Sequence, residues 1–110
     1  MNDQIEKYLV DISLALESID TFIIDTDSYD KYLNDSKTKS AVERQLIIIG
    51  EAINKIRKID SSISITSAKE IVLFRNRVVH AYDSIEDSIV WAILKNHLPI
   101  LKEEINSLLT

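Results

Sequence analysis

The fold of this chain is organised around one stretch, Phe74-Arg75-Asn76-Arg77-Val78-Val79-His80-Ala81-Tyr82. Apolar residues in and beside it form two stripes on an ideal helix, which turns about 100° per residue: Ile71, Phe74, Val78 and Ala81 on one, Val72 and Val79 on the other. Arg75 lies between the stripes, where a guanidinium is costly unless a partner satisfies it. The stretch therefore predicts a helix that packs on two sides around one arginine.

Two interpretations of the polar residues in this helix stay open on spacing alone. In the simpler one, a carboxylate elsewhere in the bundle satisfies Arg75, and His80 faces solvent. In the other, these residues carry chemistry. The second is favoured by Asn76, which lies one helical turn from His80, and by Tyr82, which lies almost in line with Arg75.

Apolar residues spaced by three and four predict further helices on both sides of this stretch, and no strands. A long helix is expected from Met1 to about Ile24, a short helical turn over Tyr29 to Leu33, and a second long helix from Lys37 to Ile59. The pattern Ser67-x-x-Glu70 is typical of a capping box, so it predicts where the third helix opens. The fourth helix is expected to open at Asp83 or Ser84.

Glycine and proline occur once each, which argues against a turn-rich β architecture. Gly50 lies inside the second long helix, where glycine costs about 1 kcal/mol relative to alanine. We therefore expect another backbone to approach closely at Gly50. Pro99 lies inside the fourth helix and removes the hydrogen bond to the Lys95 carbonyl, which predicts a kink.

These elements predict a single all-α domain over residues 1–110, built as a four-helix bundle with a short additional helical turn. The second and third helices each carry two apolar stripes, which is more than the core of a lone bundle needs. We expect the surplus to form a homodimer face, most simply a two-fold one.

Composition and charge exclude several classes of protein. The absence of cysteine rules out disulfides and thiolate metal sites, and two histidines alone do not predict a zinc site. The polar start and the short apolar runs, of which Leu46 to Ile49 is the longest, predict a cytoplasmic protein without a membrane segment. The net charge of −5 predicts weak non-specific attraction to nucleic acid, so any RNA contact must be local or assisted by a partner.

Several segments resemble HepT toxins, a branch of the HEPN superfamily of helical ribonucleases. Arg75 to Tyr82 fits the R-x4-H-x-Y pattern of these proteins, with Ala81 where glycine is common. The segments Ala41–Arg44 and Ile47–Ala52 resemble the HepT second helix, and Val90-Trp91 and Leu98–Leu101 resemble its last helix. The similarity extends over nearly the whole chain.

This resemblance implies properties that spacing does not show. HepT-like proteins form dimers in which the paired motifs face one cleft, and they act as metal-independent endoribonucleases, without a cofactor, in type VII toxin–antitoxin pairs. Their partner, MntA, is a small nucleotidyltransferase that silences the toxin by adding AMP to the motif tyrosine, which is Tyr82 here.

The residue types of the motif suit RNA cleavage without metal, because the 2′-OH of RNA is already tethered beside its phosphate. His80 is the candidate acid or base, since histidine titrates near pH 6.5 when unperturbed. Arg75 would bind the scissile phosphate with its planar fork. Asn76 could fix the tautomer of His80 or hold a ribose oxygen, and Tyr82 could stack on a base, contact phosphate or accept AMP.

Arg75 and His80 point about 140° apart on an ideal helix, so one chain does not obviously bring them to one phosphate. Either the helix ends between them, or a second subunit completes a composite cleft, which we favour. Arg77 is interpreted as solvated, and His97 as a helical residue beside Pro99 with no catalytic role.

Two rival functions come from other classes. The chain could be a non-catalytic helical subunit that binds a nucleotide or a nucleotidyltransferase, and its acidic charge favours this alternative somewhat. Plain oligomerisation is the other rival, but it leaves the polar residues of the motif unexplained.

Overall fold

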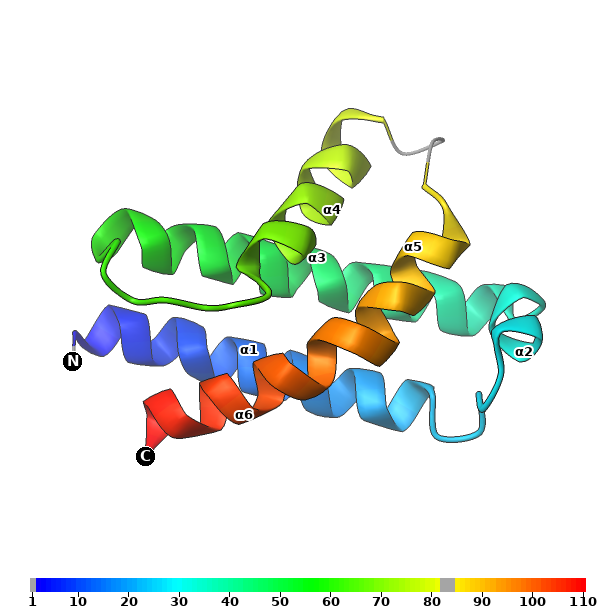
Figure 1. Ribbon diagram of the computed structural model, residues 1–110, viewed down its shortest axis with the longest axis horizontal. Coiled ribbons are helices and arrows are strands. Elements are labelled where there is room, and N and C mark those ends of the chain that lie inside the picture. Colours follow the sequence, from blue (N-terminus) through cyan, green and yellow to red (C-terminus); the bar gives the residue numbers. More distant parts are fainter. Residues whose placement is uncertain (1, 82–84) are drawn as a thin grey trace.

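The computed structural model describes residues 2–81 and 85–110, and every regular element within them is helical, which confirms the all-α prediction. Figure 1 shows their arrangement. The elements are, in chain order, α1 (Asp3–Phe22), α2 (Tyr29–Leu33), α3 (Ser36–Ile59), α4 (Ala68–His80), α5 (Asp87–Ala92), the π-helical turn η2 (Ile93–His97) and α6 (Leu98–Leu109).

The core lies where α1, α3 and α6 meet. In Figure 1, α1 and α3 run side by side along the long axis of the molecule, and α6 crosses α1. Their inward positions follow the three-and-four spacing of the sequence and are completely buried: Leu9, Ile12 and Ile19 from α1, Leu46, Ile49, Ile53 and Ile56 from α3, and Leu101 and Ile105 from α6. This pattern explains why these segments are helical, since only a helix presents all of them to one neighbour.

Side-chain caps fix the starts of the first three helices. The side-chain oxygen of Asn2 accepts from the backbone N–H groups of Gln4 and Ile5, at 2.7 and 3.3 Å. Ser28 accepts from the Lys31 N–H at 3.2 Å, and Asp35 accepts from the Thr38 N–H at 3.0 Å. Each cap satisfies backbone donors that the first helical turn leaves unpaired. The α2 bounds match the prediction, and α1 and α3 differ from theirs by one or two residues.

The short helix α2 closes one end of the molecule through aromatic packing. Tyr32 is fully buried, and its ring centroid lies 5.5 Å from that of Trp91 on α5. Tyr29 lies 6.1 Å from the same indole on the same measure, and the Lys95 amine lies 4.6 Å from its centroid. The buried Tyr32 hydroxyl has no hydrogen-bond partner among the described residues, and burial raises its pKa well above the ordinary value.

The capping box predicted from Ser67 and Glu70 is wrong. Ser67 does occupy the N-cap of α4, but its side chain makes no capping hydrogen bond. Its hydroxyl lies instead 3.3 Å from Nδ1 of His97. The neighbouring turn is held by Glu104 of α6, whose carboxylate accepts from the Thr66 N–H at 2.9 Å and from the Thr66 hydroxyl at 2.8 Å. Tertiary contacts have therefore replaced the expected local one.

The predicted start of the fourth helix is also wrong. Asp83 and Ser84 lie outside the described residues, and Ile85 and Glu86, which follow them, are not helical. The helix α5 begins at Asp87, with Glu86 at its N-cap in an extended conformation (φ −102°, ψ 123°). Asp87 is held there by Lys39 of α3, whose amine lies 3.1 Å from the carboxylate.

The irregularity predicted at Pro99 takes the form of a wide turn just before it. In η2 the backbone N–H of Leu98 bonds to the carbonyl of Ile93, five residues back instead of four. Pro99 then occupies the first turn of α6, where its missing N–H costs little. The π-helical turn thus joins α5 to α6 and leaves Pro99 at a position where no backbone N–H is needed.

At Gly50, α4 approaches α3 closely. A Cβ atom placed on Gly50 would lie 2.7 Å from Cβ of Arg75 and 3.3 Å from the carbonyl oxygen of Ile71. The predicted close contact is confirmed, and its consequence is local: the glycine makes room for Arg75 against α3.

The molecule measures 42 × 29 × 19 Å, so it is only about two helix diameters thick. In Figure 1, α4 leans away from the α1–α3 pair, and α5 descends beside it. Within residues 2–81 and 85–110, no helix is long and apolar enough to span a bilayer.

Candidate active-site groove

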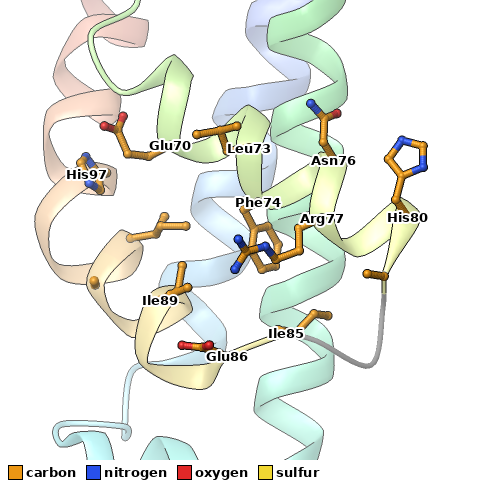
Figure 2. Close-up of a pocket in the computed structure, with 13 residues that line it drawn as sticks. Glu70, Leu73, Phe74, Asn76, Arg77, His80, Ile85, Glu86, Ile89 and His97 are labelled. Atoms are coloured by element: carbon orange, nitrogen blue, oxygen red, sulfur yellow. The ribbon is translucent and has the colours of Figure 1, made fainter.

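A groove of about 630 Å³ lies between α4 and the α5–η2 segment. Figure 2 shows its side chains, which come from both walls. The lining residues are Glu70, Leu73, Phe74, Asn76, Arg77, His80, Ala81, Ile85, Glu86, Ile89, Ala92, Ile93 and His97. The floor is apolar, with Phe74 and Ile93 buried. In Figure 2, Glu70, Asn76, His80 and His97 stand at the edges, and the Arg77 side chain extends across the middle in front of Phe74. Both histidines of the chain line this groove.

His80 is the last residue of α4, and its side chain is exposed at the edge of the groove. In Figure 2 the imidazole points away from the helix axis into open space. It has no hydrogen-bond partner among the described residues. The predicted acid or base is therefore accessible to a substrate.

Arg75 lies outside the groove lining and faces α3. Its Nη2 is 3.8 Å from Oε1 of Glu51, and its Nη1 donates to Oδ1 of Asn76 at 3.1 Å. Its Nε is buried and has no hydrogen-bond partner among the described residues. The carboxylate pairing expected for a guanidinium between apolar stripes is thus present, but the pair is long and partly exposed. Much of the donor capacity of the fork remains available to an anion.

Asn76 connects the arginine to the groove. Its side chain lines the groove, while its amide oxygen accepts from Arg75. That hydrogen bond goes to the guanidinium and not to His80, although the two residues are one helical turn apart. Asn76 is therefore placed to orient Arg75 and to offer its amide N–H groups to a ligand in the groove.

One of the two explanations for the Arg75–His80 geometry is now excluded. The helix α4 runs unbroken from Ala68 to His80, so it does not end between the two residues. Within one chain, Arg75 faces α3, whereas His80 stands at the edge of the groove and points into open space. Tyr82, the fourth predicted site residue, lies outside the described residues.

Charged side chains of both signs surround the groove. Glu70 and Glu86 contribute carboxylates, and Arg77 contributes an exposed guanidinium. No three His, Asp or Glu side chains cluster closely enough to hold a metal ion in the part of the chain that the structure describes. The groove therefore carries the imidazole of His80 and the guanidinium of Arg77. These groups suit proton transfer and the stabilisation of negative charge on a bound anion.

The sequence predicted His97 to be a helical residue without a catalytic role, and it did not predict that His97 lines the groove. It lines the groove from η2, and its Nδ1 contacts the buried Ser67 hydroxyl. The spacing of apolar residues could not predict this position, because the π-helical turn η2 changes the direction in which His97 points from the helix. The sequence signal nearest to it was Pro99, from which a kink in this helix was predicted.

Comparison with known proteins gives a consistent result. The model of the family described as "Ribonuclease HepT-like" matches residues 12–108. A Methanocaldococcus jannaschii protein named as an RNase is 32% identical over 96% of this chain and 90% of its own length. A Thermococcus cleftensis protein named a probable ribonuclease HepT is 32% identical over 94% of both chains. An RNase-named protein of Caldanaerobacter subterraneus subsp. tengcongensis is 28% identical over 74% of both. No solved structure matches this chain significantly.

Proposed function

This chain belongs to the HepT-like ribonuclease family, and from that premise we propose that it cleaves RNA internally, without metal, through Arg75, Asn76 and His80. The observation that carries the proposal is the placement of Asn76 and His80 on one wall of an open groove, with Arg75 hydrogen-bonded to Asn76. Together these groups provide proton transfer and a cation beside it.

The reaction needs little beyond those groups. A base removes the proton of the ribose 2′-OH, which attacks the adjacent phosphorus and expels the 5′-oxygen, and an acid protonates that leaving group. His80 serves as one of these two groups. Arg75 stabilises the additional charge on the phosphate in the transition state, where its fork matches two oxygens.

A homodimer supplies what one protomer lacks. Since Arg75 and His80 of one α4 face different directions, a second copy across the groove would bring the arginine of one protomer toward the histidine of the other. Apolar residues at the groove rim support this arrangement: Leu73 is 57% exposed and Ile89 is 39% exposed. On α3 the predicted surplus is covered only in part: Ala52 is buried and Ile48 is half-buried, but Ile59 is 39% exposed.

The dimer is tested by Leu73→Glu, with Leu14→Glu as its matched control. Leu14 is 56% exposed, but it lies on α1, away from the groove. Sedimentation equilibrium should show a dimer for the wild type and for the Leu14 variant, and a monomer for the Leu73 variant. A monomeric wild type would reject the composite site.

Cleavage is tested with purified protein, RNA and a chelator of divalent ions. Replacing His80 by alanine should lower the rate by about 10²- to 10⁴-fold, the usual contribution of a positioned acid or base. Mixing Arg75→Ala protomers with His80→Ala protomers should restore part of the activity, because each mixed dimer keeps one complete site. Undiminished cleavage by His80→Ala alone would place the activity elsewhere.

We further propose that the protein acts in the cytoplasm as the toxin of a toxin–antitoxin pair. A nucleotidyltransferase of the MntA type would neutralise it by adding AMP to Tyr82. Co-expression of that partner should increase the intact mass by whole adenylyl units, and Tyr82→Phe should abolish the increase. An unchanged mass in the wild type would reject the modification.

A non-catalytic role as a binding subunit of a nucleotidyltransferase is the second candidate. Glu70 and Glu86 on the groove favour it, because carboxylates repel a phosphate backbone. Growth separates the two functions: a ribonuclease toxin expressed alone should arrest cells, and His80→Ala should relieve the arrest. A binding subunit should leave growth unaffected in both cases.

A further inference from the structure

We infer that the end of the groove formed by Glu70 and His97 binds a nucleobase of the RNA, away from the bond that His80 cleaves. This inference rests on the proposed ribonuclease function and assigns a substrate-selecting role to a separate part of the same groove. Figure 2 shows Glu70 and His97 at one end of the groove and His80 at the other.

His97 is held in place by a contact that replaces a helix cap. Ser67 is almost fully buried, and its hydroxyl lies 3.3 Å from Nδ1 of His97 and 3.5 Å from the carbonyl oxygen of the same residue. The hydroxyl thereby makes no capping bond to α4, although a serine at this position usually does. Because Nδ1 is occupied by Ser67, Nε2 is the atom left for a ligand, and it has no partner among the described residues.

The backbone at His97 is also unusual. The residue ends the π-helical turn η2 and has φ −110°, far from the value of about −63° in a regular α-helix. Single π-helical turns inside helices are frequent at functional sites. Here the turn changes the phase of the helix, and His97 lines the groove beside Ile93.

The groups at this end select the part of the RNA that fits. Glu70 lies one turn after Ser67 on α4 and lines the groove, so its carboxylate would repel a phosphate and accept N–H groups. Phe74 and Ile93 provide a buried apolar floor against which a flat ring can lie. Single-stranded RNA is recognised in this way, through apolar contact with a base and hydrogen bonds to its Watson–Crick edge.

Guanine fits this set of groups best among the four bases. Its N1–H and N2–H groups point in the same direction, so one carboxylate can accept both. Nε2 of His97 then bonds to the same nucleoside. Phosphate recognition is left to Arg75 at the other part of the site.

The test uses a pool of RNA oligonucleotides with randomised sequence, from which the ends of the products are read. The proteins are the wild type, Glu70→Gln, which keeps the shape but loses the charge, and His97→Asn, which keeps a polar atom near Nδ1 but nothing at Nε2. Asn96→Ala is the matched control, because Asn96 is exposed beside His97 and does not line the groove.

The wild type and Asn96→Ala should prefer guanine about tenfold or more at one fixed distance from the cut, the discrimination typical of a bidentate contact. Glu70→Gln and His97→Asn should each lose most of that preference while still cutting RNA. Unchanged base preference in both variants would overturn the inference, and so would a variant that melts like the wild type but cuts no RNA. If the wild type itself cuts nothing, the proposed function fails, which is a different result.

Discussion

The α1–α3 pair and the α4–α5 side of this molecule are built differently. Between α1 and α3 the large aliphatic side chains of the core are completely buried. Along the groove between α4 and α5, an exposed leucine, Leu73, stands beside half-buried and exposed charges such as Glu70 and Arg77. The first region is complete within one chain, whereas the second leaves both apolar surface and hydrogen-bonding groups to be met by another molecule.

This difference separates the helices that supply most of the stability from the groove for which we propose the activity. In the pair, apolar residues spaced by three and four form the buried face of each helix. The groove side carries polar residues between its apolar stripes, and these residues cost stability unless a ligand or a second copy pairs with them. Truncation of a side chain should therefore lower the free energy of unfolding much more in the α1–α3 pair than along the groove.

Truncation of the core should give the largest effect. Ile53 is completely buried on α3, and Ile53→Ala should lower the free energy of unfolding by about 2–5 kcal/mol, as lost transfer energy and a cavity add together. Leu73→Ala, on the groove rim, should cost less than about 0.5 kcal/mol at the lowest protein concentrations. Chemical denaturation at several concentrations measures both. Equal losses in the two variants would erase the distinction between the regions.

Gly50, where α3 meets α4, should give the next largest effect. A methyl group in Gly50→Ala improves helix propensity by about 1 kcal/mol, but it falls 2.7 Å from Cβ of Arg75, which is attached to the backbone and cannot swing away. Overpacking of this kind costs about 1–3 kcal/mol, so we expect a lower melting temperature together with slower RNA cleavage as Arg75 is displaced. A variant that melts higher and cleaves normally would show that α4 is free to move away from α3.

Substitution of Glu51 should have a smaller effect, through the ion pair that it forms with Arg75 between α3 and α4. Its carboxylate lies 3.8 Å from Arg75, and the two side chains are 44% and 28% exposed, so the pair is worth at most about 1 kcal/mol. Glu51→Gln should lower kcat about fivefold with KM little changed, because orientation of Arg75 matters most in the transition state. Glu103→Gln, an exposed carboxylate on α6, should change neither constant. An increase in activity would mean that Glu51 competes with the substrate for Arg75.

Glu43 gives the smallest effect, at the other end of α3. Burial raises the pKa of its carboxyl above the ordinary value, and the nearby Asp87 raises it further, while Lys39 opposes the shift. A carboxyl with a raised folded-state pKa contributes stability below its unfolded pKa and loses it as pH rises through the folded value. Glu43→Gln should therefore raise the melting temperature at neutral pH by on the order of a few degrees, and the gain should shrink on acidification. A constant difference at all pH values would exclude this cause.

Most of the fold could be predicted from the sequence, because the helices obey the spacing of their own apolar residues. The helical turn predicted over Tyr29 to Leu33 has the bounds of α2, and the close approach at Gly50 followed from the cost of a helical glycine. The third helix opens at Ser67 as predicted, and the two errors are the capping hydrogen bond of Ser67 and the start of the fourth helix. Ser67 and Asp87 are each engaged by a distant residue, His97 and Lys39 respectively, and local patterns contain no information about such contacts.

The site was predictable in part. The sequence placed Arg75 between two stripes. The Glu51 carboxylate near Arg75 and the exposed His80 are what the simpler of the two interpretations expected, and the catalytic roles of Arg75 and His80 stay a prediction. The angle between them followed from helix geometry alone. His97 escaped prediction because its position depends on a π-helical turn, and the role of Tyr82 stays a prediction.

Trp91 gives this protein a built-in optical label, since it is the single tryptophan of the chain. Its indole is enclosed by Tyr29 and Tyr32 with the Lys95 amine over one face, and it is not among the groove-lining residues. Its fluorescence should therefore change when α2 detaches or the bundle unfolds. The same emission should stay nearly constant when RNA enters the groove. Trp91 fluorescence should therefore report unfolding without interference from RNA binding.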